Sequence, residues 1–89
     1  MVSRAMAFTP SGDFTHENAA TQLAAGLTAI AAGQVVISFS QTLRIDSSAV
    51  ACMLAWKRSA GQQGTSLRFE HLPESLTSLV GLYGVAQLL

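Results

Sequence analysis

Charged residues are scarce in this 89-residue chain. Only 11% of the residues are Asp, Glu, Lys or Arg, and five basic residues balance five acidic ones, which gives a formal net charge of zero at pH 7. An ordinary soluble domain carries roughly 25% charged residues. Nucleic-acid-binding domains usually show a basic patch, so the neutral balance argues against that class. Because 49% of the residues are hydrophobic, we expect the domain to cover part of its surface with a protein partner.

Cysteine, metal-ligand clusters and catalytic motifs are equally sparse. Cys52 is the only cysteine, which excludes an intramolecular disulfide framework. His16 and His71 are far apart in the sequence, and neither has a neighbouring residue at metal-ligand spacing. A phosphate-binding loop with Lys-Ser/Thr is absent, and the adjacent Asp46 and Ser47 do not easily form the geometry of a hydrolase triad. The sequence therefore predicts no enzyme activity, no cofactor and no metal site.

Long hydrophobic runs are also missing. No apolar stretch approaches the roughly 18 residues of a membrane-spanning helix. The N-terminal segment reaches Pro10 and Asp13 too early to contain the apolar core of a signal peptide. We therefore expect a cytoplasmic protein without direct membrane insertion, and a single domain over residues 1–89.

The order of the apolar patterns predicts an α/β fold with the element order βαβαβα. Residues 4–9 alternate weakly and residues 66–70 alternate clearly, as half-exposed strands do. Residues 35–39 are almost continuously apolar, which is typical of a strand covered on both faces. Three helices are predicted, over residues 15–33, 49–61 and 73–84. This order favours a small mixed sheet of three to four strands covered by about three helices.

The segment from Asp46 to Ser48 is the most informative part of the sequence. Asp46, Ser47 and Ser48 precede a helix, and each of their side chains can accept a hydrogen bond from the free N–H groups that open it. On this chemistry alone the three residues are a helix cap, worth about 1 kcal/mol. The alternative is that Ser47 presents its hydroxyl on an exposed loop, as a partner contact or a phosphorylation site.

Several short motifs resemble one known family. Residues 45–50, Ile-Asp-Ser-Ser-Ala-Val, resemble the Asp-Ser-Ser/Thr-Gly-hydrophobic signature of STAS domains, with Ala49 in place of the usual Gly. Residues 12–14 and 82–85 are similar to two further segments of that family. The total length, the turn at residues 62–64 and the Leu-Tyr ending look most like one branch, the small cytoplasmic STAS subunit of the Mla phospholipid-transport ABC complex. Anti-sigma factor antagonists are the neighbouring branch.

The resemblance implies a non-enzymatic binding or regulatory subunit with a STAS fold. In the Mla branch the implied partner is the cytoplasmic ATPase subunit of the transporter, at an inner-membrane complex, and the hydroxyl residue matching Ser47 couples the two proteins. In the antagonist branch the residue matching Ser47 is phosphorylated by a serine kinase that is also the anti-sigma factor. We favour the transporter branch and keep the antagonist as the alternative.

The helix after Ser47 is unusually apolar. At about 100° per residue, its apolar positions cover more than half of the circumference, which is wider than the stripe that one sheet needs. We therefore expect Met53 or Trp56 to be partly exposed, with Trp56 as the main contact of a partner. The alternative is that Trp56 folds onto its own core. The predicted partner-binding residues are Asp46, Ser47, Ser48, Met53, Trp56 and Lys57.

Overall fold

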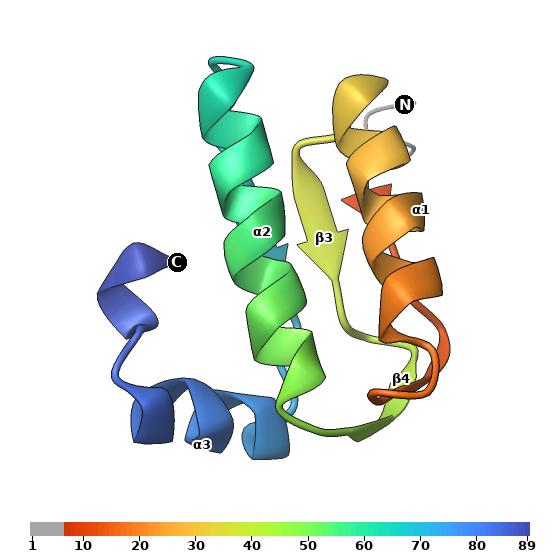
Figure 1. Cartoon of the computed structure of the whole chain (residues 1–89), viewed down its shortest axis with the longest axis vertical. Helices are drawn as coiled ribbons and strands as arrows, with labels where there is room; N and C mark the ends of the chain where they lie inside the picture. The colour runs from red at the N-terminus through yellow and green to blue at the C-terminus, as the bar shows by residue number, and fades with distance from the viewer. Residues whose placement is uncertain (1–6) are drawn as a thin grey trace.

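Five short strands form two parallel sheets in the computed structural model, which describes residues 7–89 (Figure 1). One sheet has the order β1-β3-β5 and contains β1 (Ala7–Phe8), β3 (Val36–Ser38) and β5 (Arg68–Glu70). The other sheet pairs β2 (Gly12–Phe14) with β4 (Thr42–Ile45). The predicted first strand is present as β1, and residues 4–6 of that prediction lie outside the described residues.

Three helices alternate with these strands as expected. They are α1 (Ala19–Ala31), α2 (Ser48–Gln62) and α3 (Glu74–Tyr83), and a short 3-10 helix, Ala86–Leu88, follows. In Figure 1, α1 and α2 lie side by side in front of β3, α3 lies across the lower end of α2, and the C-terminal segment runs beside α2. The predicted α/β class is confirmed.

The three-stranded sheet turns one row of side chains toward the helices. Phe8 pairs with Ile37 and Ile37 pairs with Phe69, so these three residues share a face. Ile37 is completely buried on that face. Val35 is 37% exposed and Val36 is half-buried. The prediction of a strand covered on both faces is therefore wrong for the first half of residues 35–39.

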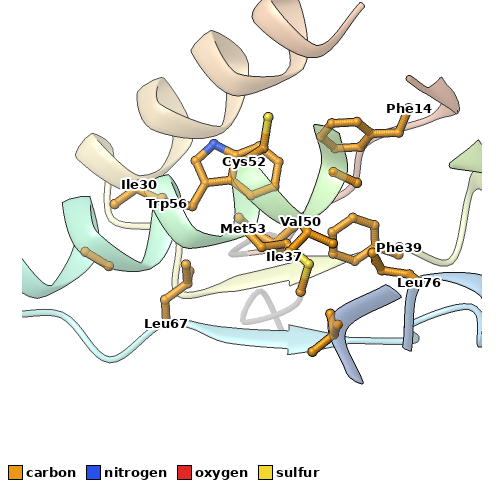
Figure 2. Close-up of a cluster of buried hydrophobic side chains, with 13 residues drawn as sticks. Phe14, Ile30, Ile37, Phe39, Val50, Cys52, Met53, Trp56, Leu67 and Leu76 are labelled. Carbon is orange, nitrogen blue, oxygen red and sulfur yellow. The ribbon is translucent and has the colours of Figure 1, made fainter. Parts of the chain in front are cut away.

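Trp56 lies at the centre of the core (Figure 2). Its side chain is 0% exposed, and its ring lies edge-on to Phe14, with the ring centroids 5.8 Å apart. The indole Nε1–H donates a hydrogen bond to the Leu23 carbonyl of α1, at 3.1 Å. The backbone of α1 can approach this closely because position 26 is glycine, where a Cβ would lie 2.3 Å from Nε1.

The expectation that Met53 or Trp56 is partly exposed is wrong. Both side chains are buried. The physical reason is that α2 packs against α1 and α3 as well as the sheet, so a wide apolar arc is covered rather than one narrow stripe. The low charge of the chain is therefore explained in part by the size of this interior.

Two helix boundaries differ from their predicted positions. The helix after Ser47 continues through Gly61 and ends before Gly64, which has a φ of 78°. The first helix begins at Ala19 rather than near Thr15. Residues 15–18 form a turn instead, in which the Asn18 side chain accepts the Thr15 N–H at 2.9 Å.

Replacing Gly26 with alanine should destabilise the domain by about 1–3 kcal/mol, because the new methyl group would overlap the Trp56 ring. The matched control is Gly61→Ala, also within a helix but with open space around the new Cβ. That change should raise the free energy of unfolding by up to about 1 kcal/mol. Urea unfolding of both variants measures the difference. Equal stabilisation by the two substitutions would show that the indole can move aside.

Candidate functional site

The segment from Asp46 to Ser48 lies where β4 leads into α2. The Asp46 backbone N–H donates to the Phe14 carbonyl at 3.2 Å, which extends the pairing of β2 with β4. Ile45, the last residue of β4, packs against the core. The strand pair therefore fixes the position at which α2 begins.

Asp46 holds two segments of the chain together. Its Oδ1 accepts the Ser48 N–H at 2.9 Å and also accepts the Ser48 hydroxyl. Its Oδ2 accepts the His16 N–H at 2.9 Å and lies 3.1 Å from Nδ1 of His16. The hydrogen bond from the Ser48 hydroxyl, followed by that from the His16 backbone, holds the pKa of Asp46 well below its ordinary value. At neutral pH an ionised carboxylate thus links the loop before α1 to the first turn of α2.

Ser47 occupies the N-cap position of α2, but its side chain does not cap the helix. Within residues 7–89 its hydroxyl makes no hydrogen bond, and the residue is exposed. The capping side chain is that of Asp46, which accepts the Ser48 N–H. Of the three residues predicted to share the cap, Asp46 receives the hydrogen bonds, Ser48 donates them and Ser47 faces solvent.

The other three predicted partner-binding residues are used within the domain. Met53 and Trp56 belong to the core. Lys57 is half-buried, its Nζ donates to the Leu67 carbonyl, and the same atom lies 5.6 Å from the centroid of the Phe69 ring. The structure therefore brings Asp46, Ser47 and Ser48 together, and it separates them from an interior that holds Met53 and Trp56.

An apolar hollow beside Ser47 was missed by reasoning from the sequence. It has a volume of about 430 Å³ and is lined by Ser47, Val50, Ala51, Leu54, Tyr83 and Val85. Tyr83, the last residue of α3, is 52% exposed. The spacing of residues 47, 51 and 54 was the available signal, since i, i+4 and i+7 lie on one helix face.

A hydrolase triad is not assembled around Ser47. Asp46 contacts His16, as a triad would require, but the Ser47 hydroxyl makes no hydrogen bond to His16. The described residues contain no group of three side chains that could hold a metal ion. In the same part of the chain, no helix has the length and apolar character needed to cross a membrane.

A family model described as "Mlab, STAS domain" matches residues 3–89, and the chain therefore belongs to the STAS-domain family. STAS domains are protein-interaction and regulatory domains. Among solved structures, the anti-sigma factor antagonist SpoIIAA in its unphosphorylated form is similar, with a TM-score of 0.67 at 20% identity. The alignment covers 92% of this chain and 74% of that chain, and at this identity it shows a shared fold. No protein of curated function matches the chain.

Removing the Asp46 carboxylate should lower the free energy of unfolding at neutral pH, because the His16 and Ser48 N–H groups would lose their acceptor. The pKa of this carboxyl is lower in the folded chain than its ordinary value of 3.8. The stabilisation is therefore present above about pH 4 and is lost as the pH falls further. Denaturant unfolding of the parent and Asp46→Ala should give free energies that approach each other in acid.

The control for this pH series is Glu17→Ala, which removes the exposed carboxylate of the residue next to His16, in the loop before α1. Its free energy of unfolding should follow that of the parent at every pH. A gap between the parent and Asp46→Ala that stays constant below about pH 4 would contradict the lowered pKa of Asp46.

Proposed function

We propose that this STAS domain is a non-enzymatic subunit that binds the cytoplasmic ATPase of a phospholipid-transport ABC complex and supports its assembly or activity. The Mlab description of the matching family model supports this partner. On this proposal the domain works in the cytoplasm, at an inner-membrane complex that it reaches through the ATPase. It acts through the Ser47 loop and the outer face of α2, without a cofactor.

The exposed Ser47 hydroxyl is the observation that carries this proposal. A serine at an N-cap is usually explained by the helix itself. Here Asp46 supplies the capping carboxylate, so α2 does not use the Ser47 hydroxyl. Ser47 is one of the residues that line an apolar hollow. A polar group in this position can orient a protein that buries the surrounding apolar surface.

The second candidate function is that of an anti-sigma factor antagonist phosphorylated on Ser47. The likeness to SpoIIAA, which was determined in its unphosphorylated form, supports it. A phosphate on Ser47 would add a charge of about −1.5 to −2 and would interact favourably with the N-terminus of α2. The ionised Asp46 beside it would oppose that charge. We favour the transporter subunit because the family model carries the Mlab description.

Purification of the tagged chain from its native host should separate the two functions. A transporter subunit is expected to copurify in a lasting complex with an ABC ATPase and to keep its unmodified mass. An antagonist is expected to copurify with a kinase-like anti-sigma factor and to show a species heavier by one phosphate. Intact-mass spectrometry measures whether the chain is phosphorylated, and mass-spectrometric identification of the copurified protein shows which partner it binds. An abundant phosphorylated species would overturn the preferred function.

Replacing Ser47 with alanine should change the free energy of unfolding by no more than about 0.5 kcal/mol, because its hydroxyl has no partner in residues 7–89. The same change should lower the activity of the complex with the ATPase. Thermal melting and ATP-turnover assays measure the two effects. Ser66→Ala, at an exposed serine before β5, is the control and should affect neither. Full activity of Ser47→Ala would show that the hydroxyl serves no contact.

A further inference from the structure

A cavity lies between α2, α3 and the C-terminal segment, residues 84–89, which runs beside α2 in Figure 1. We call it the C-terminal cavity, and its volume is about 300 Å³. Its floor reaches the hydrophobic core, because the lining residues Met53 and Val80 are 1% and 9% exposed. Phe69 of β5 and Leu89 also line it and pack against the same core. The hollow described above has none of these residues in its lining.

The rim of the C-terminal cavity is exposed and carries a polar side chain. Leu72, Thr77 and Ala86 lie at this rim, and Leu72 is 38% exposed. Among the described residues that line the cavity, Thr77 alone has a polar side chain. Thr77 and Ala86 are also the smallest side chains of the lining, and they leave a volume that larger residues would fill. A mostly apolar lining with few polar groups is typical of small-ligand pockets, whose volumes begin at roughly 300 Å³.

The volume and lining of the C-terminal cavity define the size of its occupant. Ordered water is a poor occupant, because a buried water needs about two to four polar partners and the described lining offers Thr77 alone. An apolar cavity of about 150 Å³ holds one benzene molecule, so twice that volume holds roughly ten carbons. This is enough for one unbranched alkyl chain and too little for the two chains of a phospholipid.

The segment that forms the rim of the cavity provides no cation for an anionic head group. Residues 72–89 contain no Lys or Arg, and Glu74 is their one charged residue. The ammonium group of Lys57, beside the lining ring of Phe69, already donates to a backbone carbonyl. Arg68, which precedes Phe69 in β5, is held in an ion pair. A carboxylate or phosphate at the rim would therefore meet a like charge and no counter-ion, which favours an uncharged head group.

We propose that the C-terminal cavity binds one unbranched alkyl chain of about ten carbons with an uncharged polar end, as in a primary alcohol. The chain lies against Met53 and Val80, and its hydroxyl lies at the rim, where Thr77 can donate and accept a hydrogen bond. The flexible side chain of Met53 can adapt to the shape of such a chain. This site is independent of the proposed transporter function, since none of its residues belongs to the Ser47 loop.

Titration of the purified chain with 1-hexanol, 1-octanol and 1-decanol tests this site. The readout is the methyl NMR signal of Met53, which Met53→Leu identifies among the three methionines of the chain. 1-Decanol should shift this signal saturably, with one molecule bound per chain. The affinity should rise about three- to fourfold for each added methylene, as expected when each CH₂ is buried. Sodium decanoate, which is charged, and dihexanoylphosphatidylcholine, which has two chains, should bind roughly tenfold more weakly than 1-decanol or worse.

Two variants fill the cavity from its rim. Ala86→Leu and Thr77→Leu each place a larger apolar side chain in the lining, and each should weaken the binding of 1-decanol roughly tenfold or more. The matched controls are Gln87→Leu and Ser78→Leu, which make the same addition at neighbouring exposed residues outside the lining. Both controls should bind 1-decanol like the parent. Thermal melting without ligand shows whether each variant is folded.

The alkyl-chain site would be overturned if the parent gave no response at Met53, or if both filled variants bound 1-decanol as tightly as the parent. Equal weakening in the control variants would also overturn it, because the alcohol would then be adhering to the surface in general. Binding of decanoate or of the phospholipid as tight as that of 1-decanol would contradict an uncharged single chain. If one filled variant does not fold, the other decides.

Discussion

The contact between Trp56 and Gly26 determines how closely α1 and α2 approach each other. The missing side chain at position 26 lets the backbone of α1 reach the indole, whose N–H then finds the Leu23 carbonyl. Phe8 of one sheet and Phe14 of the other both pack edge-on against the same ring. One side chain thus touches a neighbouring helix and both sheets. A domain of 89 residues buries a smaller share of its surface than a larger domain does, so a contact shared by several elements is important for its packing.

The junction before α2 divides two tasks between adjacent residues. Asp46 satisfies backbone donors from two segments, and Ser48 completes its hydrogen bonding. Because these contacts are complete without Ser47, the residue between them can face outward at no cost to the helix. The outward hydroxyl is therefore a consequence of how the neighbouring carboxylate is placed. Stability and recognition can be altered separately at this junction.

The helices and the site motif could be predicted from the sequence because their signals are local. The helix predicted over residues 73–84 is bounded by Pro73, which precedes its first turn, and by Gly84, which ends it in the left-handed conformation with a φ of 67°. The Asp-Ser-Ser motif located the start of α2. Strands β2 and β4 were not predicted as a pair, since three and four residues are too few for an alternating pattern. They are defined by pairing across about 30 residues of chain, as in Gly12 with Thr42.

The position of Trp56 could not be predicted for a different reason. The width of the apolar arc on α2 was recognised correctly, but the arc is equally compatible with an exposed interface and with a deep core. What decides between them is which elements pack around α2, and the close approach of one of them, α1, depends on Gly26. The most exposed large hydrophobic side chains lie elsewhere in the described residues, at Leu43 on β4 and at Leu82, Tyr83 and Leu88 near the C-terminus.

The strand order has a consequence for how the chain is made. β3 lies at the centre of its sheet, paired on one side with β1 and on the other with β5, which follows about 30 residues later. When synthesis has reached only α2, one edge of β3 therefore has no strand to pair with, because β5 has not been made. The side of α2 that packs against α3 is also uncovered at that point. The β1-β3-β5 sheet spans both halves of the chain, whereas the β2-β4 sheet lies within residues 12–45. The β1-β3-β5 sheet can therefore be completed only after β5 has been synthesised.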